Sequence, residues 1–385
     1  MGTTIFEHMS ALARERGAIN LGQGFPDDGY AGESPLARRL QAAAARAMIG
    51  QSQQYPPSPG LAVLRAGLAA HYSARGPAVL PAGVIVTSGA TEAIAAAILA
   101  LVSPGNEVLL FAPAYDAYAP LVRRAGGVAV IVPLRPPGWA YDEAAIHAAI
   151  TPRTRAMIVN DPLNPLGTVA SAEELAMLAR LCTAHDLVAI CDEVWEGVRF
   201  DGHRHRSLAA QPGMAGRAVK IGSAGKLFGL TGWKVGWAIA GEALAALVGR
   251  AHQFLTFTTP PALQFAVAEG LAYEIQLFTA QHDQWTRSRS RLIDGLREAG
   301  FVVADNAATW FVCIDLAASG IGMSDTAFAQ HAIDAGVATI PVSALYEAPH
   351  PPTHLLRLCF TKPDVVLDTA VLRLSAARGG TGAGG

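Results

Sequence analysis

Two lysines, Lys226 and Lys234, lie eight residues apart in a segment that runs from Ser223 to Trp237. The segment reads SAGKLFGLTGWKVGW, and besides the two lysines it holds four glycines and no other charged residue. A lysine acts as a nucleophile only after it loses its proton, and an apolar setting or a second cation nearby favours that loss. The spacing therefore raises the question whether the two ammonium groups serve one task or two.

A second candidate site lies at residues 84–94 (VIVTSGATEAI), where an apolar run leads into a turn and then a helical segment. The backbone N–H groups of Gly89, Ala90 and Thr91 would lie at a helix N-terminus, which is suited to binding phosphate. An ordinary helix cap by Ser88 or Thr91 explains the same residues equally well. The turn has no G-x-G-x-x-G pattern, so a dinucleotide site has little support.

Two further polar side chains follow apolar, strand-like runs. Asn164 lies in a proline-rich turn after residues 155–159, and a turn role alone would account for it. Asp192 ends a run that has the character of a buried strand, so its carboxylate needs a partner, either a structural one or a ligand. Ligand sites of open α/β sheets lie at the carboxyl ends of the strands, where these residues, Ser223 and the Gly89 turn are expected to converge.

The elements that must position these residues follow a regular alternation between about residues 40 and 280. Short β-rich apolar runs alternate there with alanine- and leucine-rich helical segments, which predicts a mostly parallel sheet covered by helices. Only a short glycine-rich link joins the last two runs, so they are expected to pair antiparallel. The expected strands lie at residues 83–89, 107–113, 128–134, 155–161, 187–194, 218–224 and 234–240.

The C-terminal part predicts a separate, smaller α+β domain. Its expected elements are a long polar helix at 281–300, a strand at 309–316, a helix at 324–336, and strands at 337–345 and 355–362. The division we expect is an N-terminal arm with part of the small domain at 1–38, a large domain at 39–282, the C-terminal small domain at 283–376 and a disordered tail at 377–385.

Composition excludes several classes of protein. The chain has 385 residues, of which 51% are apolar and 16% are charged, as is typical of a compact enzyme and not of a disordered chain. A net charge of -2 gives no reason to expect nucleic acid as a partner. The sequence has neither an 18-residue apolar run nor a signal-like N-terminus, so we expect a cytoplasmic protein without membrane contact.

The cysteine and histidine patterns give no reason to predict a metal site. The four cysteines form no C-x-x-C pair, and we expect reduced core residues at Cys182, Cys191, Cys313 and Cys359. The sequence HRHR at residues 203–206 is expected to be a solvated surface loop, because no second cluster of ligand residues accompanies it.

Taken together, the motifs resemble the pyridoxal-phosphate (PLP) aminotransferases of fold type I, class I and II, and most closely the methionine and kynurenine aminotransferases. The resemblance covers nearly the whole chain and implies an α/β fold, with a mostly parallel seven-stranded sheet flanked by helices and a smaller α+β domain. The motifs that carry it, in chain order, are IFEHMSALA, INLGQGFPD, QYPPSPG, TSGATEA, APAYDAYAP, NPLG, DEV, SAGK with GWKVGW, HQFLTF and RLCF.

The resemblance gives the two lysines different tasks. Lys226 matches the family lysine that forms a Schiff base with PLP, which requires the deprotonated amine. Lys234 matches the cation that binds the cofactor phosphate and stays charged. Ser223 and the backbone N–H groups of Ala90 and Thr91 are implied as further phosphate contacts.

Four residues are implied as contacts of the cofactor ring. Asp192 is expected to pair with the protonated pyridine nitrogen, Asn164 to hydrogen-bond the ring hydroxyl oxygen, and Tyr115 to stack on the ring. The chain departs from the family at Trp195, where a tyrosine usually donates to the same hydroxyl oxygen. The indole N–H can replace that donor, which we favour, or the ring can pack beside the cofactor without a bond.

The resemblance also implies a substrate site and a dimer. Arg357 is expected to hold the substrate α-carboxylate through its planar fork, beside Asn164 and a segment that contains Gly24. In the family, residues matching Tyr55 and Phe257 reach the site of the neighbouring subunit, which implies a homodimer with shared active sites. Without the resemblance, a core position would be the more common interpretation of Phe257.

The implied activity is transfer of the amino group of an L-amino acid to a 2-oxo acid. The substrate amine would displace Lys226, which would then move the proton from the substrate Cα. Apolar and aromatic residues near the pocket favour methionine or an aromatic amino acid as donor. The kynurenine branch often has histidine where this chain has Thr258, which argues against kynurenine.

Two alternative functions stay open. A cysteine-conjugate β-lyase or a racemase would use the same scaffold and the same cofactor. A PLP-sensing regulator with an aminotransferase-like domain would need an additional DNA-binding segment, and this chain has no spare basic N-terminal region.

Overall fold

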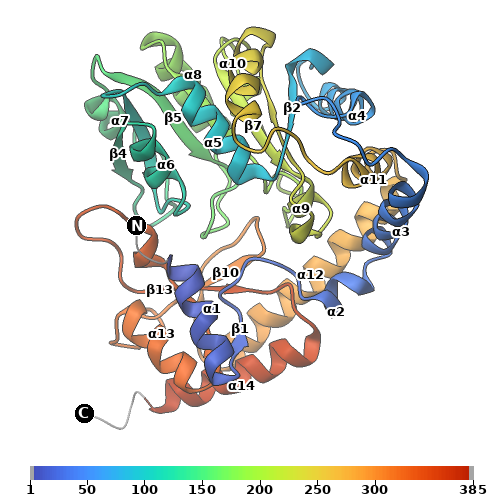
Figure 1. The fold of residues 1–385 in the computed structure, drawn as a ribbon. Coiled ribbons are helices and arrows are strands. Elements are labelled where there is room, and N and C mark those ends of the chain that lie inside the picture. The colour runs from blue at the N-terminus through green and yellow to red at the C-terminus, as the bar shows by residue number, and fades with distance from the viewer. Residues whose placement is uncertain (1–3, 381–385) are drawn as a thin grey trace.

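Seven apolar runs pair into one sheet in the computed structural model, which describes residues 4–380 (Figure 1). The strand order is β2-β8-β7-β6-β5-β3-β4, and all pairs are parallel except those of β8 with β2 and β7. All seven expected strands are present, and the expected antiparallel pairing of the last two is confirmed. Their bounds are β2 Val84–Thr87, β3 Glu107–Ala112, β4 Val128–Pro133, β5 Thr154–Asn160, β6 Val188–Asp192, β7 Ala218–Ser223 and β8 Gly236–Ile239.

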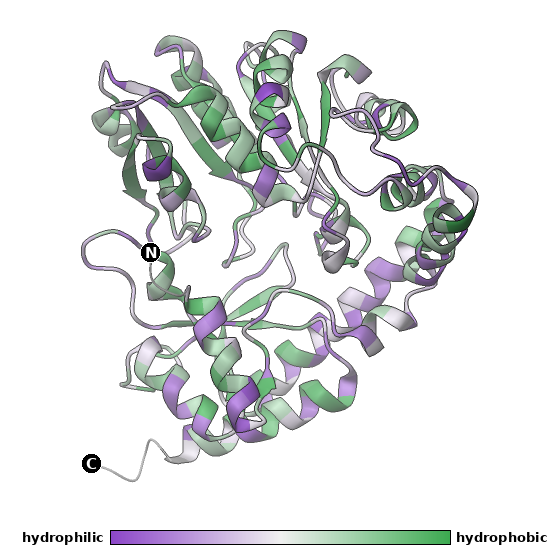
Figure 2. Cartoon of the chain, in the orientation of Figure 1, coloured by the Kyte–Doolittle hydropathy of each residue, from purple (hydrophilic) through white to green (hydrophobic). Residues whose placement is uncertain are grey.

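Helices cover both faces of this sheet because successive strand residues point to opposite sides. Leu109 and Met157 pack in a core with residues of α7 and α8, whereas their neighbours Leu110 and Ile158 pack in a second core with α5, α6 and α10. The strands are therefore apolar along their length, as Figure 2 shows. The helix bounds are α5 Ala90–Leu101, α6 Tyr118–Arg124, α7 Glu143–Ala149, α8 Ala172–Ala184 and α10 Glu242–Gln253.

The smaller domain is built on an antiparallel sheet in the order β12-β13-β10-β9, with a short parallel pair of β1 and β11 beside it. The expected strand at 337–345 is instead two short strands followed by a 3-10 helix, because Pro341 lacks the N–H that would continue the ladder. The strand bounds are β1 Ile19–Asn20, β9 Val302–Val303, β10 Phe311–Asp315, β11 Val337–Ala338, β12 Ile340–Pro341 and β13 Leu355–Cys359, and the 3-10 helix is Val342–Leu345.

Three helices pack on the small sheet: α1 Ile5–Arg16, α13 Asp325–Asp334 and α14 Asp364–Gly380. The predicted tail, residues 377–385, begins inside α14, which is helical through residue 380. Ala377 is buried in the small-domain core, and its carbonyl accepts a hydrogen bond from His331 at 3.0 Å, which holds the end of the helix in place. The rest of the expected tail, residues 381–385, lies outside the described residues.

One long helix, α12, runs across the boundary between the two domains, which the chain also crosses between β1 and α3. It spans Ile275–Glu298, starts six residues before the expected helix, and contains the boundary that we predicted at 282/283. One part packs against α3 (Pro35–Gly50), and the other contributes Trp285 and Leu292 to the small-domain core. Figure 1 shows α12 running from α3 to the small domain. The remaining helices are α2 Asp28–Glu33, α4 Ala62–Ser73, α9 Ala224–Leu227 and α11 Pro261–Gly270, with short 3-10 helices at Pro81–Gly83, Leu208–Ala210 and Thr231–Trp233.

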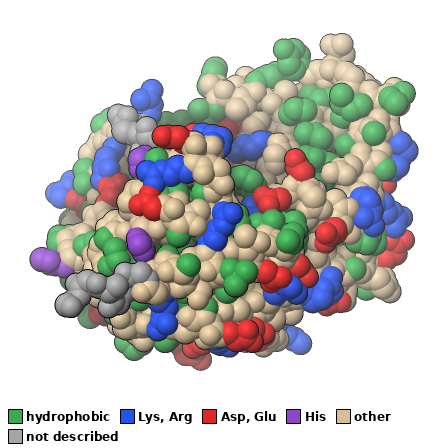
Figure 3. Space-filling model, turned by 90° about the horizontal axis from the view of Figure 1, so that it is seen from below, with side chains coloured by type: hydrophobic (Ala, Val, Ile, Leu, Met, Phe, Trp, Pro, Cys, Tyr) green, Lys and Arg blue, Asp and Glu red, His purple; other side chains and the backbone are tan. Residues whose placement is uncertain are grey.

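The cysteines lie in the core, as the sequence predicts. All four cysteines are free and buried. Acidic and basic side chains are interspersed over the small-domain face seen in Figure 3. Among the helices of residues 4–380, none is long and apolar enough to cross a membrane.

Candidate active site

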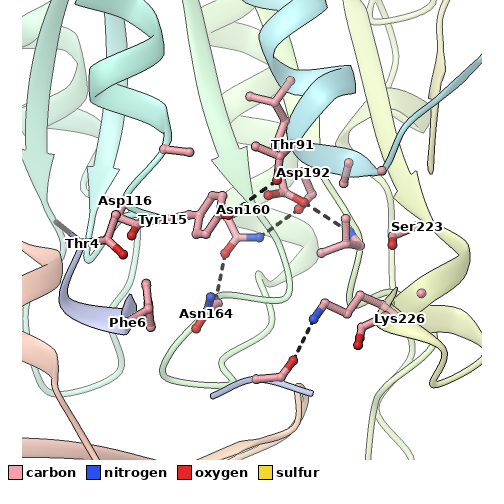
Figure 4. Close-up of a pocket in the computed structure, with 18 of the residues that line it drawn as sticks. Thr4, Phe6, Thr91, Tyr115, Asp116, Asn160, Asn164, Asp192, Ser223 and Lys226 are labelled. Atoms are coloured by element: carbon pink, nitrogen blue, oxygen red, sulfur yellow. Dashed lines mark hydrogen bonds between the residues drawn. The ribbon is translucent and has the colours of Figure 1, made fainter. Parts of the chain in front are cut away.

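A cavity of about 1270 Å³ lies where the carboxyl ends of the large-sheet strands meet residues of the small domain. It is lined by 11 of the 13 residues expected in the site, together with Phe6, Asn160 and Phe311 (Figure 4). The expected residues that line it are Gly24, Ala90, Thr91, Tyr115, Asn164, Asp192, Trp195, Ser223, Lys226, Lys234 and Arg357. Tyr55 and Phe257 are not among its lining residues.

The ends of β5 and β6 hold two of the polar groups in a fixed relation. Asn160 and Asp192 are direct partners in the parallel ladder, and the Asn160 amide donates to the Asp192 backbone carbonyl at 3.0 Å. The Asn160 side-chain oxygen accepts the backbone N–H of Asn164 at 2.9 Å, so it fixes the turn that carries Asn164. Figure 4 shows Asn160 between the other two residues. Asn160 was not predicted, although a polar residue at the end of an apolar run was the available signal.

The Asp192 carboxylate is buried and hydrogen-bonded. The Tyr118 hydroxyl donates to one oxygen, and the Val194 backbone N–H donates to the other at 3.4 Å. Burial raises the pKa of Asp192 to about 6, while the bond from Tyr118 acts in the opposite direction. The carboxylate is therefore ionised at neutral pH and can pair with a cationic group in the cavity. Tyr118 was missed, although it lies three residues after Tyr115 in the same motif.

Lys226 reaches into the cavity from α9, the short helix that follows β7. Its amine donates to the Gly24 carbonyl at 2.9 Å and lies 4.6 Å from the centre of the Trp195 ring and 4.9 Å from that of Trp310. The pKa of Lys226 is lowered to about 8, mainly by burial. The cations of Arg357 and Lys234 act in the same direction, whereas Asp192 acts in the opposite one. A substantial neutral fraction at ordinary pH makes this amine available as a nucleophile and a base.

The start of α5 forms an anion cradle with Lys234. Gly89 caps the helix at φ 87°, and a Cβ added there would lie 3.0 Å from the Lys234 Nζ atom. A Cβ on Gly236 would lie 2.6 Å from the Ala90 nitrogen, so this glycine lets β8 approach the helix start closely. Helix N–H groups, an ammonium and the nearby Ser223 hydroxyl make a donor set that fits a phosphate.

Arg357 lies in the middle of β13 and is 1% exposed. Its guanidinium donates to the Asn164 side-chain oxygen at 3.0 Å and to the Gly22 carbonyl, and it lies 3.9 Å from the centre of the Phe311 ring and 4.7 Å from that of Phe6. Burial lowers the pKa of Arg357 to about 10, which still leaves it charged at neutral pH.

The arginine is a preorganised donor. Its Nε atom is buried and has no hydrogen-bond partner, so the donor capacity of the fork is not fully used by the protein. Gly24 is required beside it, because an added Cβ would lie 2.5 Å from the Phe311 ring. A planar fork flanked by rings suits a carboxylate ligand.

Trp195 packs as part of an aromatic group beside Lys226. It is 3% exposed, and its ring meets those of Trp310 and Phe311 edge-on at 5.1 and 5.4 Å. Trp310 and Phe311 were not predicted, because nothing in a strand-like apolar run distinguishes a residue that faces a cavity from one that faces the core.

Tyr55 and Phe257 lie together on the surface, outside this cavity. They are 82% and 42% exposed, and their rings pack edge-on with centres 5.7 Å apart. Phe257 has a left-handed backbone, with φ 65°. A core position for Phe257, the more common interpretation without the resemblance, is therefore wrong. Other large apolar side chains exposed on neighbouring segments of the chain are Met48, Ile49, Phe254 and Leu255.

One wall of the cavity comes from α6 and the residues before it. Asp116 lines the cavity half-buried; burial raises the pKa of its carboxyl group, and Arg357 acts in the opposite direction. Ala117, Leu121 and Arg124 follow at helical spacing, so they share one face of the helix. Within residues 4–380, Arg124 forms no ion pair, whereas the adjacent Arg123 pairs with Glu347. Neither Asp116 nor Arg124 was predicted.

The prediction that residues 203–206 form a solvated surface loop is wrong for His205. His203, Arg204 and Arg206 are exposed, but the His205 side chain is only 6% exposed and pairs with Glu193 and Asp161. The carboxylates that draw His205 inward follow other strands, so the local sequence carries no signal of its burial.

Known proteins are similar to this chain in sequence and in fold. The sequence pattern of the family described as aminotransferase class I and II matches residues 16–374. A probable N-succinyldiaminopimelate aminotransferase of Mycobacterium tuberculosis is 46% identical over 385 residues, covering 97% of this chain and 96% of the relative. The methionine aminotransferase of Escherichia coli is 37% identical over 379 residues, covering 97% and 96%. A solved structure of the M. tuberculosis enzyme superposes with a TM-score of 0.92 at 45% identity, covering 98% of this chain and 97% of the other.

Proposed function

The chain belongs to the class I and II aminotransferases, and we propose that the residues of the cavity bind PLP and carry out transfer between an L-amino acid and a 2-oxo acid. The observation that carries the proposal is that a lysine with a pKa of about 8 and an ionised, buried carboxylate face the same cavity. The family depends on PLP, and three features of this chain fit that group. The cradle of α5 and Lys234 fits the phosphate, Asp192 fits the pyridine nitrogen, and Asn164 fits the ring hydroxyl.

When bound, PLP supplies an electrophilic aldehyde carbon and a ring that stabilises negative charge. Side chains of the protein supply the nucleophile, the proton acceptor and the negative charge beside the ring nitrogen. Neutral Lys226 is the nucleophile that holds the cofactor, and once released it accepts the proton of the substrate Cα at Nζ. Asp192 keeps its negative charge beside the ring nitrogen, aided by the bond from Tyr118. The aromatic group around Lys226 keeps water away from its amine.

Arg357 holds the substrate α-carboxylate in this proposal. Its guanidinium is already oriented by Asn164 and by the rings of Phe6 and Phe311, so little conformational freedom is lost when a carboxylate binds. The buried setting also strengthens the charge-assisted hydrogen bonds that the fork makes.

For the donor, we propose an amino acid with an apolar or aromatic side chain, such as methionine. Ile5, Phe6 and Leu121 line the cavity, and the negative charge of Asp116 disfavours a short acidic side chain there. A panel of amino donors against several 2-oxo acids tests this directly. Aspartate and glutamate should give far lower kcat/KM values than methionine or phenylalanine, and equal values would contradict the proposed role of Asp116.

One observation favours a second class of donor, a long amino acid whose far end carries a carboxylate. The face of α6 leads from Ala117 past Leu121 to the unpaired Arg124, about 10 Å away at 1.5 Å per residue. The relative with 46% identity is named for such a substrate. Arg124→Gln should then lower kcat/KM for N-succinyldiaminopimelate and leave methionine unchanged. Arg123→Gln, which removes the neighbouring arginine of the same cavity wall, shows whether the loss is specific to Arg124.

We propose a homodimer in which Tyr55 and Phe257 reach the site of the partner subunit. The support is that these two aromatic side chains are exposed, packed together and outside their own cavity. A Tyr55→Ala chain mixed with a Lys226→Ala chain should regain part of the activity, because a mixed dimer contains one intact site. Unmixed variants are the control. If the activity does not return although the subunits are shown to exchange, the sites are not shared.

Chemical labelling tests the cofactor assignment itself. Borohydride reduction of the holoenzyme followed by peptide mapping should place the pyridoxyl group on Lys226, and a label on Lys234 would contradict the assignment. Product analysis with a β-chlorinated amino acid separates transfer from elimination. Pyruvate and ammonia as the dominant products would favour the β-lyase alternative.

A further inference from the structure

A group of buried charged residues lies behind the strand ends that carry Asn160 and Asp192. The next residue on each strand, Asp161 and Glu193, is buried and does not line the cavity. This is the alternation expected of strand residues, which sends one side chain toward the cavity and the next to the opposite side. We call Asp161, Glu193, Glu196, His205 and Lys220 the rear cluster.

His205 lies between two of the three carboxylates of the rear cluster. Its Nε2 atom lies 2.7 Å from a Glu193 oxygen, within hydrogen-bond distance. Its Nδ1 atom lies 3.5 Å from an Asp161 oxygen, an ionic contact in which neither atom makes a hydrogen bond. The side chains of all three residues are at most 6% exposed. The histidine comes from the loop at 203–206, so it is the only member of the rear cluster that lies outside the strands and the turns that follow them.

The charges around this histidine favour its protonated form. The rear cluster contains three carboxylates, and its lysine, Lys220, contacts only Glu193 and Glu196, which leaves His205 as the cation beside Asp161. Burial alone would lower the pKa of His205, but Glu193 and Asp161 outweigh it and raise the pKa to about 9. Glu193, Glu196 and His205 lie close enough together to hold a metal ion, but the Lys220 ammonium already supplies the cation between the two glutamates.

Asp161 and Glu193, the two carboxylates beside His205, are each tied to neighbouring turns and strands by further hydrogen bonds. The Asp161 backbone N–H donates to the Asp192 carbonyl at 3.1 Å, and an Asp161 side-chain oxygen accepts the Ala170 N–H at 2.8 Å. Asp161 thus closes both ends of the turn that carries Asn164. The Glu193 N–H donates to the Ile221 carbonyl at 3.1 Å, and its side chain accepts the Ser207 hydroxyl at 2.7 Å.

We propose that protonated His205 is a positioning residue that holds the turn after β5 and the turn after β6 in register from behind the cavity. Through Asp161 it sets the place of Asn164, and through Glu193 it sets the place of Asp192. The inference rests on the proposed function, since these two residues are the proposed contacts of opposite sides of the cofactor ring. A shift of the turn after β5 would displace Asn164, and a shift of the turn after β6 would displace Asp192. Displacements of about 1 Å can cost on the order of 10²-fold in rate.

The test compares His205→Gln with His203→Gln in the holoenzyme. Glutamine can keep one bond to Glu193 but loses the charge and the contact with Asp161, whereas His203 is exposed in the same loop and serves as the matched control. We expect His205→Gln to lower kcat by about tenfold or more with KM changed by less than about threefold. The pH midpoint of the absorption change of the bound cofactor should also shift, by about half a unit or more.

A purely structural role would give a different result. His205→Gln would then melt at a lower temperature than His203→Gln, but kcat and the absorption midpoint of the two variants would agree within error, and the proposal would be overturned. If the wild type and His203→Gln show no cofactor absorption at all, the proposed function fails rather than the role of His205.

Two further measurements keep the test decisive if His205→Gln does not fold. Asp161→Asn keeps the size of the side chain and the bond from Ala170 but removes the negative charge opposite His205. It should also shift the absorption midpoint, by a smaller amount, and an unchanged midpoint would contradict the proposal. In the wild type, nitrogen chemical shifts should identify His205 as an imidazolium at pH 7.5, and a neutral ring there would contradict it as well.

Discussion

The cavity and the rear cluster each contain a buried lysine, and the pKa values of the two lysines move in opposite directions. Lys220 lies on β7 and Lys226 lies just past its end, six residues later. Burial disfavours the charge of both. Around Lys220, however, Glu193 and Glu196 outweigh burial and raise its pKa, whereas around Lys226 the neighbours are two tryptophan rings, a carbonyl and two cations, and the pKa falls to about 8.

The difference shows that partners, and not burial alone, decide the charge of a lysine. One side of the sheet end holds a lysine in the ammonium form as part of the structure. The other side holds a lysine that can lose its proton and react. The two environments lie on opposite sides of the same strand ends, because successive strand residues point to opposite sides of the sheet.

Removal of the reactive lysine should have the largest effect. Lys226→Ala should reduce transamination by on the order of 10⁴-fold or more, because both the nucleophile and the proton acceptor are lost. Single-turnover kinetics with a good amino donor measures this. Lys226→Arg is the control that keeps a cation in place; activity near that of the wild type in either variant would mean that another residue moves the proton.

Removal of the structural lysine should reduce stability. Lys220→Met leaves Glu196 without its cation and Glu193 with His205 alone, and a broken buried ion pair costs about 3–5 kcal/mol. Urea unfolding of the cofactor-free protein gives this value. The double variant Lys220→Met with Glu196→Gln should recover part of the loss, and a Lys220→Met protein as stable as the wild type would show that the rear cluster is not a coupled ionic group.

The pH dependence of stability should separate the two regions further. Because the pKa of His205 is raised from 6.5 to about 9, its stabilising contribution is fully present below pH 6.5 and is lost as the pH rises through 9. The difference in unfolding free energy between wild type and His205→Gln should therefore decrease by about 3 kcal/mol over that range. His203→Gln, at an exposed position of the same loop, is the matched control.

The carboxylate-binding arginine should show a smaller effect that depends on the substrate. Arg357→Lys keeps the charge but loses the fork, and kcat/KM for amino acids should fall by about 1.5–3 kcal/mol in transition-state binding. Amines that lack a carboxylate are the control and should be affected far less. Equal losses for both kinds of donor would show that Arg357 does not hold the carboxylate.

The smallest effect is expected at Trp195, the aromatic neighbour of Lys226. Trp195→Phe removes the indole donor but keeps a ring against Trp310, so the rate should fall by about 0.5–1.5 kcal/mol. The pH midpoint of the cofactor absorption change should rise. An unchanged midpoint in a spectroscopic titration would mean that Trp195 only packs beside the cofactor.

The parts of the site that follow from strand order could be predicted from the sequence. Asn164, Asp192 and Ser223 each come just after or at the end of an apolar run, and parallel strands bring such ends to one edge. Arg357 could be predicted because a charged side chain inside an apolar strand is costly to bury unless it has a binding partner. The cross-subunit task of Tyr55 and Phe257 stays a prediction, since a single chain contains only half of such a contact.

The residues that were missed depend on contacts between distant segments. Tyr118 bonds to Asp192 from 74 positions away, and Asp161 pairs with His205 from 44 positions away. The local pattern around His205, with arginines on both sides, is that of a surface loop. Only the three-dimensional arrangement shows that two carboxylates behind the sheet edge draw this one side chain inward.

The helix that joins the two domains has a mechanical consequence. The 24 residues of α12 make a rod of about 36 Å, and no flexible linker replaces it at the domain boundary. The Gln281 amide on this rod donates to the Phe228 carbonyl at 2.8 Å, two residues beyond Lys226, while Trp285 is embedded in the small domain. This helix therefore contacts both the small-domain core and the residues next to the short helix that carries Lys226. Any movement of α12 would therefore be felt two residues from Lys226, through the bond between Gln281 and Phe228.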